Sequence, residues 1–168
     1  MKNLIKFHKN NITLALTNIN FLFPFFYCYF KGLSYLQYLI LNAAFWSIVY
    51  HLYKNHKHGM GLEIHNKTLS KILQKIDTVS AFLLIFYSLI FLQNKSSNEE
   101  HLYIVPYLII IMLINNPIQS AVTVICFYFL FISERCKDNE TNKYVYFHSA
   151  WHLVSFLCLW LWLIKVVV

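Results

Sequence analysis

The sequence predicts an all-α protein, a polytopic transmembrane helical bundle that forms a single integral membrane domain over residues 1–168. Of its residues, 58% are hydrophobic and only 12% are charged, which leaves too few polar side chains to cover a water-soluble globule. Helices satisfy their own backbone hydrogen bonds in lipid, and a helical span needs about 20 apolar residues. About six apolar stretches approach that length. They cover residues 12–30, 33–53, 78–93, 102–116, 118–133 and 145–168.

The first two stretches and their flanks set the expected topology. Stretch 12–30 follows a basic N-terminal segment, as the apolar region of a signal peptide does. It is longer than such a region and lacks a small-residue cleavage pattern, so we expect it to remain as the first span. Stretch 33–53 is followed by the lysine-rich connection 54–76. By the positive-inside rule, both basic regions should be cytosolic.

The remaining stretches are less regular. The second half of connection 54–76 has apolar residues at helical spacing, which predicts an interfacial helix leading into stretch 78–93. The sequence Asn115-Asn116-Pro117 interrupts the next two stretches, and proline breaks regular helical hydrogen bonding. The last stretch, 145–168, follows a polar connection, 134–143.

The formal net charge of +7 does not indicate nucleic-acid binding. Thirteen of the fourteen cationic residues are lysines, and most lie in the connections rather than on one face. Membrane topology explains this distribution. The expected surroundings are therefore a bilayer, with no nucleic-acid partner.

Candidate chemistry begins at the end of the second stretch. Ser47 and His51 are four residues apart, so they share one helix face. Asp77 opens the third stretch, and every other acidic residue is placed in a connection, which makes Asp77 the only carboxylate expected where apolar structure begins. Because the third stretch directly follows the second, Asp77 should return to the membrane face that carries His51.

His148 and His152 repeat the four-residue spacing at the start of the last stretch. Two imidazoles one turn apart can chelate one metal ion. With His51 they make three neutral imidazoles and an open fourth position, the usual arrangement of catalytic Zn²⁺, near which water becomes nucleophilic at neutral pH. We expect Asp77 to orient or deprotonate that water and Ser47 to donate a hydrogen bond to the developing oxyanion.

Each of these residues also has an ordinary interpretation. A histidine near a membrane interface usually faces headgroups, a serine in a span usually bonds its own backbone, and an aspartate at a helix start is a common N-cap. Two pairs at helical spacing together with a span-associated acid favour a functional site, because ionisable groups inside a membrane are functional by default.

At these residues the chain resembles the CREST-type membrane hydrolase superfamily, which includes alkaline ceramidases, progestin and adiponectin receptors, and Per1-like and myomaker-related proteins. Members share S-x-x-x-H near the end of the second helix, D near the start of the third, and H-x-x-x-H in the last of seven helices. The stretch Tyr146–His152, YFHSAWH, is most similar to the myomaker-related branch. The resemblance implies zinc held by His51, His148 and His152, with Asp77 and Ser47 assisting hydrolysis of an amide or ester bond in a lipid substrate.

The number of stretches departs from that family pattern. If all six crossed the membrane, the final histidine pair would lie across an apolar layer of about 30 Å from His51. As a helix, residues 102–133 would extend about 48 Å, too long for one upright crossing and too short for three. The metal site therefore requires that 102–133 cross once in net terms, as a kinked or re-entrant pair.

Two other functions remain open from the sequence. A non-catalytic membrane receptor or fusion-type protein could keep the same zinc site as a structural element. A small transporter or channel would instead line a polar path, for which the candidate residues are Asn18, Asn20, Asn115 and Gln119.

Overall fold

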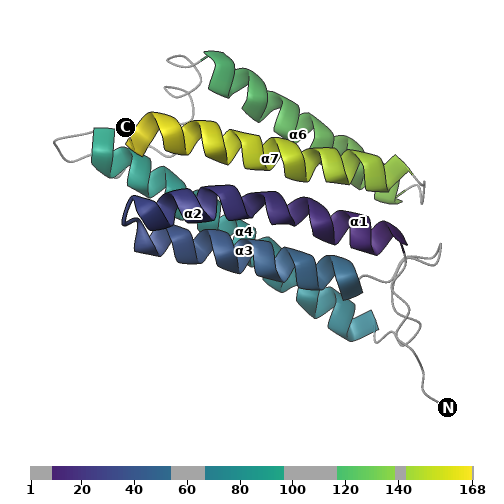
Figure 1. Ribbon diagram of the computed structural model, residues 1–168. Coiled ribbons are helices and arrows are strands. Elements are labelled where there is room, and N and C mark those ends of the chain that lie inside the picture. The colour runs from purple at the N-terminus through teal and green to yellow at the C-terminus, as the bar shows by residue number, and fades with distance from the viewer. Residues whose placement is uncertain (1–8, 54–66, 97–116, 139–142, 168) are drawn as a thin grey trace.

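The computed structural model describes residues 9–53, 67–96, 117–138 and 143–167, and these residues are almost entirely helical (Figure 1). The prediction of an all-α fold is confirmed. The predicted stretch 102–116 lies outside the described residues. The elements are α1 (Lys9–Thr17), the 3-10 helix η1 (Asn18–Phe21), α2 (Leu22–Phe30), α3 (Ser34–Tyr53), α4 (Lys67–Ser96), α6 (Pro117–Asp138) and α7 (Lys143–Val167).

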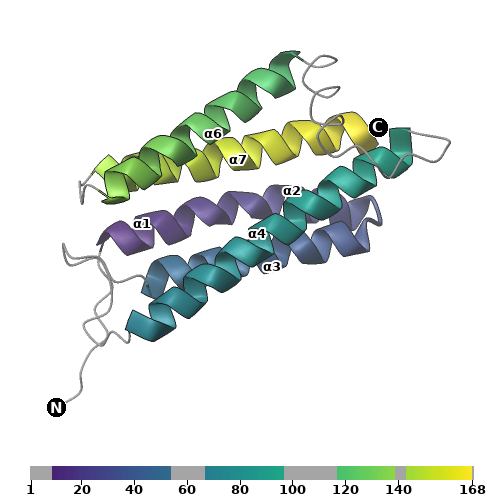
Figure 2. The same ribbon diagram turned by 180° about the vertical axis from the view of Figure 1, so that it is seen from behind.

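The helices lie lengthwise beside one another (Figures 1 and 2). Helix α6 packs on α7, α3 packs on α4, and α1 and α2 lie between α3 and α7. The end of α3 and the beginnings of α1, α4 and α7 gather at one end of the bundle, whereas α4 ends and α6 begins at the other. Helix α6 therefore makes one net passage between α4 and α7. One net passage is what the predicted metal site requires, because it brings the start of α7 to the end of the bundle where α3 ends.

The first predicted span is one continuous helical segment, in which the 3-10 helix η1 lies between α1 and α2. Pro24 lacks an amide hydrogen and its ring conflicts with the carbonyl four residues earlier, so the chain forms η1 just before it. The side chains of Thr17 and Asn18 both donate to the carbonyl oxygen of Leu14, at 2.7 and 3.1 Å. Asn20 donates to the carbonyl oxygen of Thr17 at 3.0 Å. Side-chain bonds of this kind compete with the regular ladder and bend helices.

These contacts bear on the transporter interpretation. The side-chain amides of Asn18 and Asn20 donate hydrogen bonds to backbone carbonyl oxygens of the preceding turn. Asn115 and the side chain of Gln119 lie outside the described part of the chain. Nothing in the described residues therefore adds to the case for a polar path.

A glycine ends α2 and turns the chain into α3. Gly32 has φ +69, the left-handed region that favours glycine. Its amide donates to Tyr29 O at 3.2 Å, and the amide of Leu33 donates to Cys28 O at 2.9 Å. This is the Schellman pattern, which satisfies the last carbonyls of a helix.

We expect Gly32→Ala to lower the free energy of unfolding by about 1–2 kcal/mol, because an L-residue is strained at this φ. A Cβ at Gly32 would meet nothing within 4 Å, so the cost is conformational and not steric. Thermal unfolding in detergent measures it. Gly32→Asn is the control and should lose less, since asparagine tolerates this conformation; equal losses for both variants would contradict the explanation.

Two stretches of the described chain, Asn11–Phe30 and Lys143–Ile164, are long and apolar enough to cross a membrane. The prediction of about six spans is not confirmed by this criterion. In α3 the reason lies in the composition: Gln37, Asn42, His51 and several tyrosines lower its mean hydropathy, although the helix has 20 residues. Aromatic residues with polar tips count as hydrophobic in composition but are only partly so in physical terms.

Candidate metal centre

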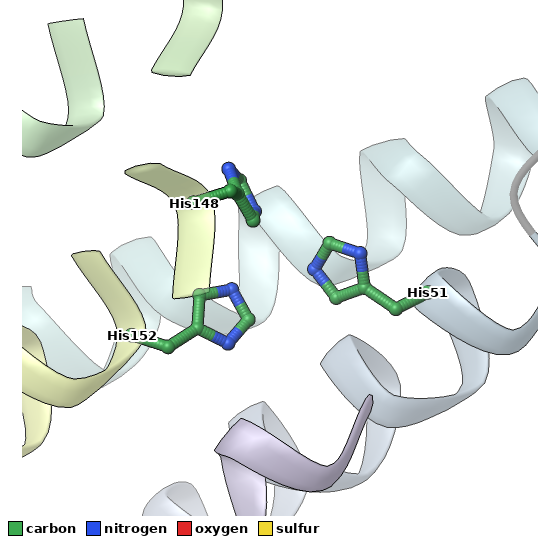
Figure 3. A group of neighbouring side chains, drawn as sticks. All are labelled: His51, His148 and His152. Carbon is green, nitrogen blue, oxygen red and sulfur yellow. The ribbon is translucent and has the colours of Figure 1, made fainter. Parts of the chain in front are cut away.

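Three histidines from distant parts of the chain meet inside the bundle. His51 lies in the last turn of α3, and His148 and His152 lie near the start of α7. Each offers a ring nitrogen, and these atoms all lie within 4.8 Å of one another. Exposed fractions are 0% for His51, 5% for His148 and 3% for His152. Figure 3 shows the three rings facing a common space between the two helices. This group can hold a metal ion.

The ring positions fit a tetrahedral ion. The ring centres form a nearly equilateral triangle with sides of 4.9 Å (His51–His148), 5.0 Å (His51–His152) and 4.8 Å (His148–His152). Zinc binds imidazole nitrogens at about 2.0–2.1 Å in tetrahedral sites, which places the centres of three bound rings roughly 5 Å apart.

Helical periodicity explains how the ligands reach the interior. The buried residues of α3 recur every three or four positions, so they form one stripe on the helix. Its members are Leu36, Ile40, Ala44, Ser47, Tyr50 and His51. On α7, Tyr144, His148 and His152 are buried at four-residue intervals, which places them on one face. Both pairs predicted from spacing therefore face inward.

Hydroxyl groups from two further helices contact the α7 histidines. Thr17 Oγ1, on α1, lies 3.2 Å from His152 Nδ1. Ser133 Oγ, on α6, lies 3.3 Å from His148 Nδ1. Neither residue was among the site residues predicted from the sequence. The available signal was a hydroxyl side chain in an apolar stretch, which is too common to single out without a structure.

Aromatic rings surround the three imidazoles. Tyr50 contacts His51 with ring centres 4.9 Å apart. Tyr144 stacks on His148 at 4.8 Å, and Trp151 lies 4.9 Å from both His148 and His152. Tyr50 and Tyr144 are themselves buried. The rings exclude water from the sides of the site and leave a low-dielectric surrounding, in which charges interact more strongly.

The two predicted catalytic residues differ in where the structure places them. Ser47 is buried one turn before His51 on the same stripe of α3. Asp77 is half-buried on α4, and its carboxylate interacts electrostatically with Tyr50 and Tyr144, the tyrosines that contact His51 and His148. Among the described residues, the group of candidate ligands consists of the three histidines alone.

One prediction about an acidic residue was wrong, and one ordinary interpretation of another is excluded. Asp77 does not open a helix, because α4 begins ten residues earlier at Lys67 and includes the predicted interfacial segment; an N-cap role is thereby excluded. Glu134 was placed in a connection but lies inside α6. It follows Ser133 and, like Asp77, interacts electrostatically with Tyr50 and Tyr144. Asp77 is therefore not the only carboxylate that a described helix carries.

Comparison with known proteins adds no relative: no family model, curated protein or solved structure matches the chain.

Proposed function

We propose that this protein is a multi-pass membrane hydrolase that binds Zn²⁺ through His51, His148 and His152 and cleaves an amide or ester bond of a lipid substrate. The observation that carries the proposal is the convergence of three buried imidazoles from α3 and α7. Buried histidines on separate helices rarely point at one another without a shared ligand, since each polar ring must be compensated for lost hydration.

The distribution of side chains supports embedding in a bilayer. Polar residues lie inside the bundle, including the three histidines, Asn18, Ser80 and Ser133. Large apolar residues cover the outside, also on the helices that the hydropathy criterion does not select. On α3, α4 and α6 they include Tyr35, Leu41, Phe45, Val79, Phe82, Phe86, Ile118, Phe127 and Phe131. A soluble monomer rarely exposes apolar surface so extensively.

The position of the site in the bundle supports a location near the cytosolic face. The histidines lie at the end of the bundle where α3 ends and α4 begins (Figure 1). The lysine-rich connection joins those helices, and the positive-inside rule assigns it to the cytosol. The proposed site therefore lies near the cytosolic face.

Reaction chemistry follows from the residues around the imidazoles. Bound zinc would supply Lewis acidity toward water and toward the substrate carbonyl. Asp77 would accept the proton of the attacking water, a role suited to a half-buried carboxylate. Ser47, one turn from His51, would donate a hydrogen bond to the oxyanion as it forms. The order of these residues along the chain also supports the resemblance to the CREST-type superfamily.

Metal content tests the proposal. Protein purified in detergent is expected to hold about one zinc ion per chain when assayed by elemental analysis, as a single three-histidine site requires. The double variant His148→Ala and His152→Ala is expected to hold essentially none, because one imidazole alone does not retain the ion. Wild-type protein that contains no zinc, and takes none up on titration, would rule out the proposed function.

One observation favours a second function, a receptor or fusion-type protein with structural zinc. No carboxylate belongs to the ligand group within the described residues, so the site as it stands can bind an ion without any acid–base partner. The two functions differ in what Asp77 does, since only a hydrolase needs its carboxylate.

A further inference from the structure

Each of the two α7 histidines contacts a hydroxyl group that already donates its only proton to a backbone carbonyl oxygen. Thr17 Oγ1 donates to the carbonyl oxygen of Leu14 at 2.7 Å and lies 3.2 Å from His152 Nδ1. Ser133 Oγ donates to the carbonyl oxygen of Leu130 at 2.8 Å and lies 3.3 Å from His148 Nδ1. The same arrangement occurs twice, on two different helices.

Proton counting assigns the direction of the second bond. A hydroxyl carries one hydrogen and two acceptor lone pairs. Because a backbone carbonyl can only accept, the Thr17 and Ser133 protons point at Leu14 and Leu130. Each hydroxyl can then only accept from the histidine, so Nδ1 of His148 and of His152 must carry a hydrogen. In a neutral imidazole the other nitrogen, Nε2, is left with its lone pair.

We propose that Thr17 and Ser133 are positioning residues that hold His152 and His148 in the Nδ1–H tautomer, with the Nε2 lone pairs available to the metal. This inference rests on the proposed zinc site. Ligating histidines generally donate their second ring nitrogen to an outer acceptor, which fixes the tautomer and the ring orientation. Here that acceptor is a hydroxyl, which in turn donates to a carbonyl oxygen of its own helix. Helices α1 and α6 therefore both support ligands that α7 carries.

Burial of the two histidines makes the contacts with Ser133 and the half-buried Thr17 effective. Ser133 is fully buried, and His148 and His152 are 5% and 3% exposed, so water cannot readily replace a deleted partner. Without its acceptor, a neutral imidazole can exchange to the tautomer that places a hydrogen on Nε2 and blocks ligation. Loss of an outer acceptor commonly weakens metal affinity by about 10–100-fold.

Zinc affinity of the full-length protein in detergent, measured by competition with a chromophoric chelator, tests the proposal. Thr17→Val and Ser133→Ala are each expected to weaken zinc binding by about 10–100-fold. Thr17→Ser and Ser133→Thr keep the hydroxyl and should restore near wild-type affinity.

A matched control separates positioning from packing. Thr123 is a half-buried hydroxyl residue on α6 that contacts Cys158 on α7 at 3.3 Å. Thr123→Val should leave zinc affinity unchanged. If Thr17→Val and Ser133→Ala destabilise the zinc-free and zinc-bound proteins equally, linkage requires an unchanged zinc affinity; the bonds would then be structural only, and the proposal would be overturned.

A second measurement does not depend on any variant folding. In wild-type protein freed of zinc and labelled with ¹⁵N-histidine, the nitrogen chemical shifts report which ring nitrogen carries the hydrogen. We expect His148 and His152 to be in the Nδ1–H form. Finding the Nε2–H form at His148 and His152 would overturn the proposal even if wild-type protein binds zinc, whereas a failure of wild-type protein to bind zinc would remove the proposed function instead.

Discussion

Replacing His51 with alanine is expected to weaken zinc binding by a factor of about 10²–10³. Sites with four protein ligands bind zinc with apparent free energies of about 10–16 kcal/mol, or roughly 3–4 kcal/mol for each ligand. The α7 pair, His148 and His152, would remain one turn apart, but among the described residues His51 is the only member of the ligand group from outside α7. Zinc titration against a competing chelator measures the loss directly.

The control for this variant is a large-to-small substitution elsewhere on the same helix stripe. Ile40 is fully buried on α3 and belongs to the apolar cluster away from the histidines, so Ile40→Ala should cost about 2–5 kcal/mol of stability. It should nevertheless keep zinc affinity and the rise in melting temperature that zinc confers on the wild type. His51→Ala should show no such rise. Unchanged zinc affinity in His51→Ala would contradict the three-histidine site.

The histidine pairs could be predicted from the sequence because helical geometry determines them. Residues four apart share a face whatever the helix packs against, and both Ser47 with His51 and His148 with His152 do so. Their inward direction also followed, since ionisable groups turn away from lipid. That α3 and α7 would bring these faces together depended on the net passage made by α6, which no local pattern determines.

Apolar stretches alone do not predict the helix boundaries near the acids, for a physical reason, although residue spacing did predict a helix ahead of Asp77. Hydropathy marks the thickness of an apolar layer, whereas a helix continues for as long as its backbone bonds and side chains allow. Helix α4 therefore starts ten residues before Asp77, and α6 continues past Glu134. Lysine, glutamate and arginine are good helix formers, so these charged segments extend the helices beyond the apolar stretches.

The hydroxyl partners of the histidines could not be predicted from the sequence either. Thr17 is 135 residues from His152, and Ser133 is 15 residues from His148 across a helix connection. Each contact exists only because α1 and α6 pack against α7. A serine or threonine in an apolar helix has a local partner in its own backbone, and both residues make that local bond too. Only the tertiary contact distinguishes them.

Asp77→Asn is expected to lower kcat/KM by about 10²–10⁴, the usual contribution of a general base, while zinc content and thermal stability stay near wild-type values. Asparagine matches aspartate in size but cannot accept the proton of the attacking water. The measurement uses a fluorogenic lipid amide and a matching lipid ester in mixed micelles, with zinc content determined on the same samples. Hydrolysis by wild-type protein is expected for at least one of the two.

Glu134→Gln provides the matched comparison, because both carboxylates act electrostatically on Tyr50 and Tyr144. If the field of a nearby negative charge were what matters, both variants should lose activity to a similar degree. If proton transfer matters, Asp77→Asn should lose far more, since Asp77 is the carboxylate proposed to accept the proton of the attacking water. Wild-type protein that binds zinc but hydrolyses neither substrate, with Asp77→Asn indistinguishable from it, would instead assign the three histidines a structural role.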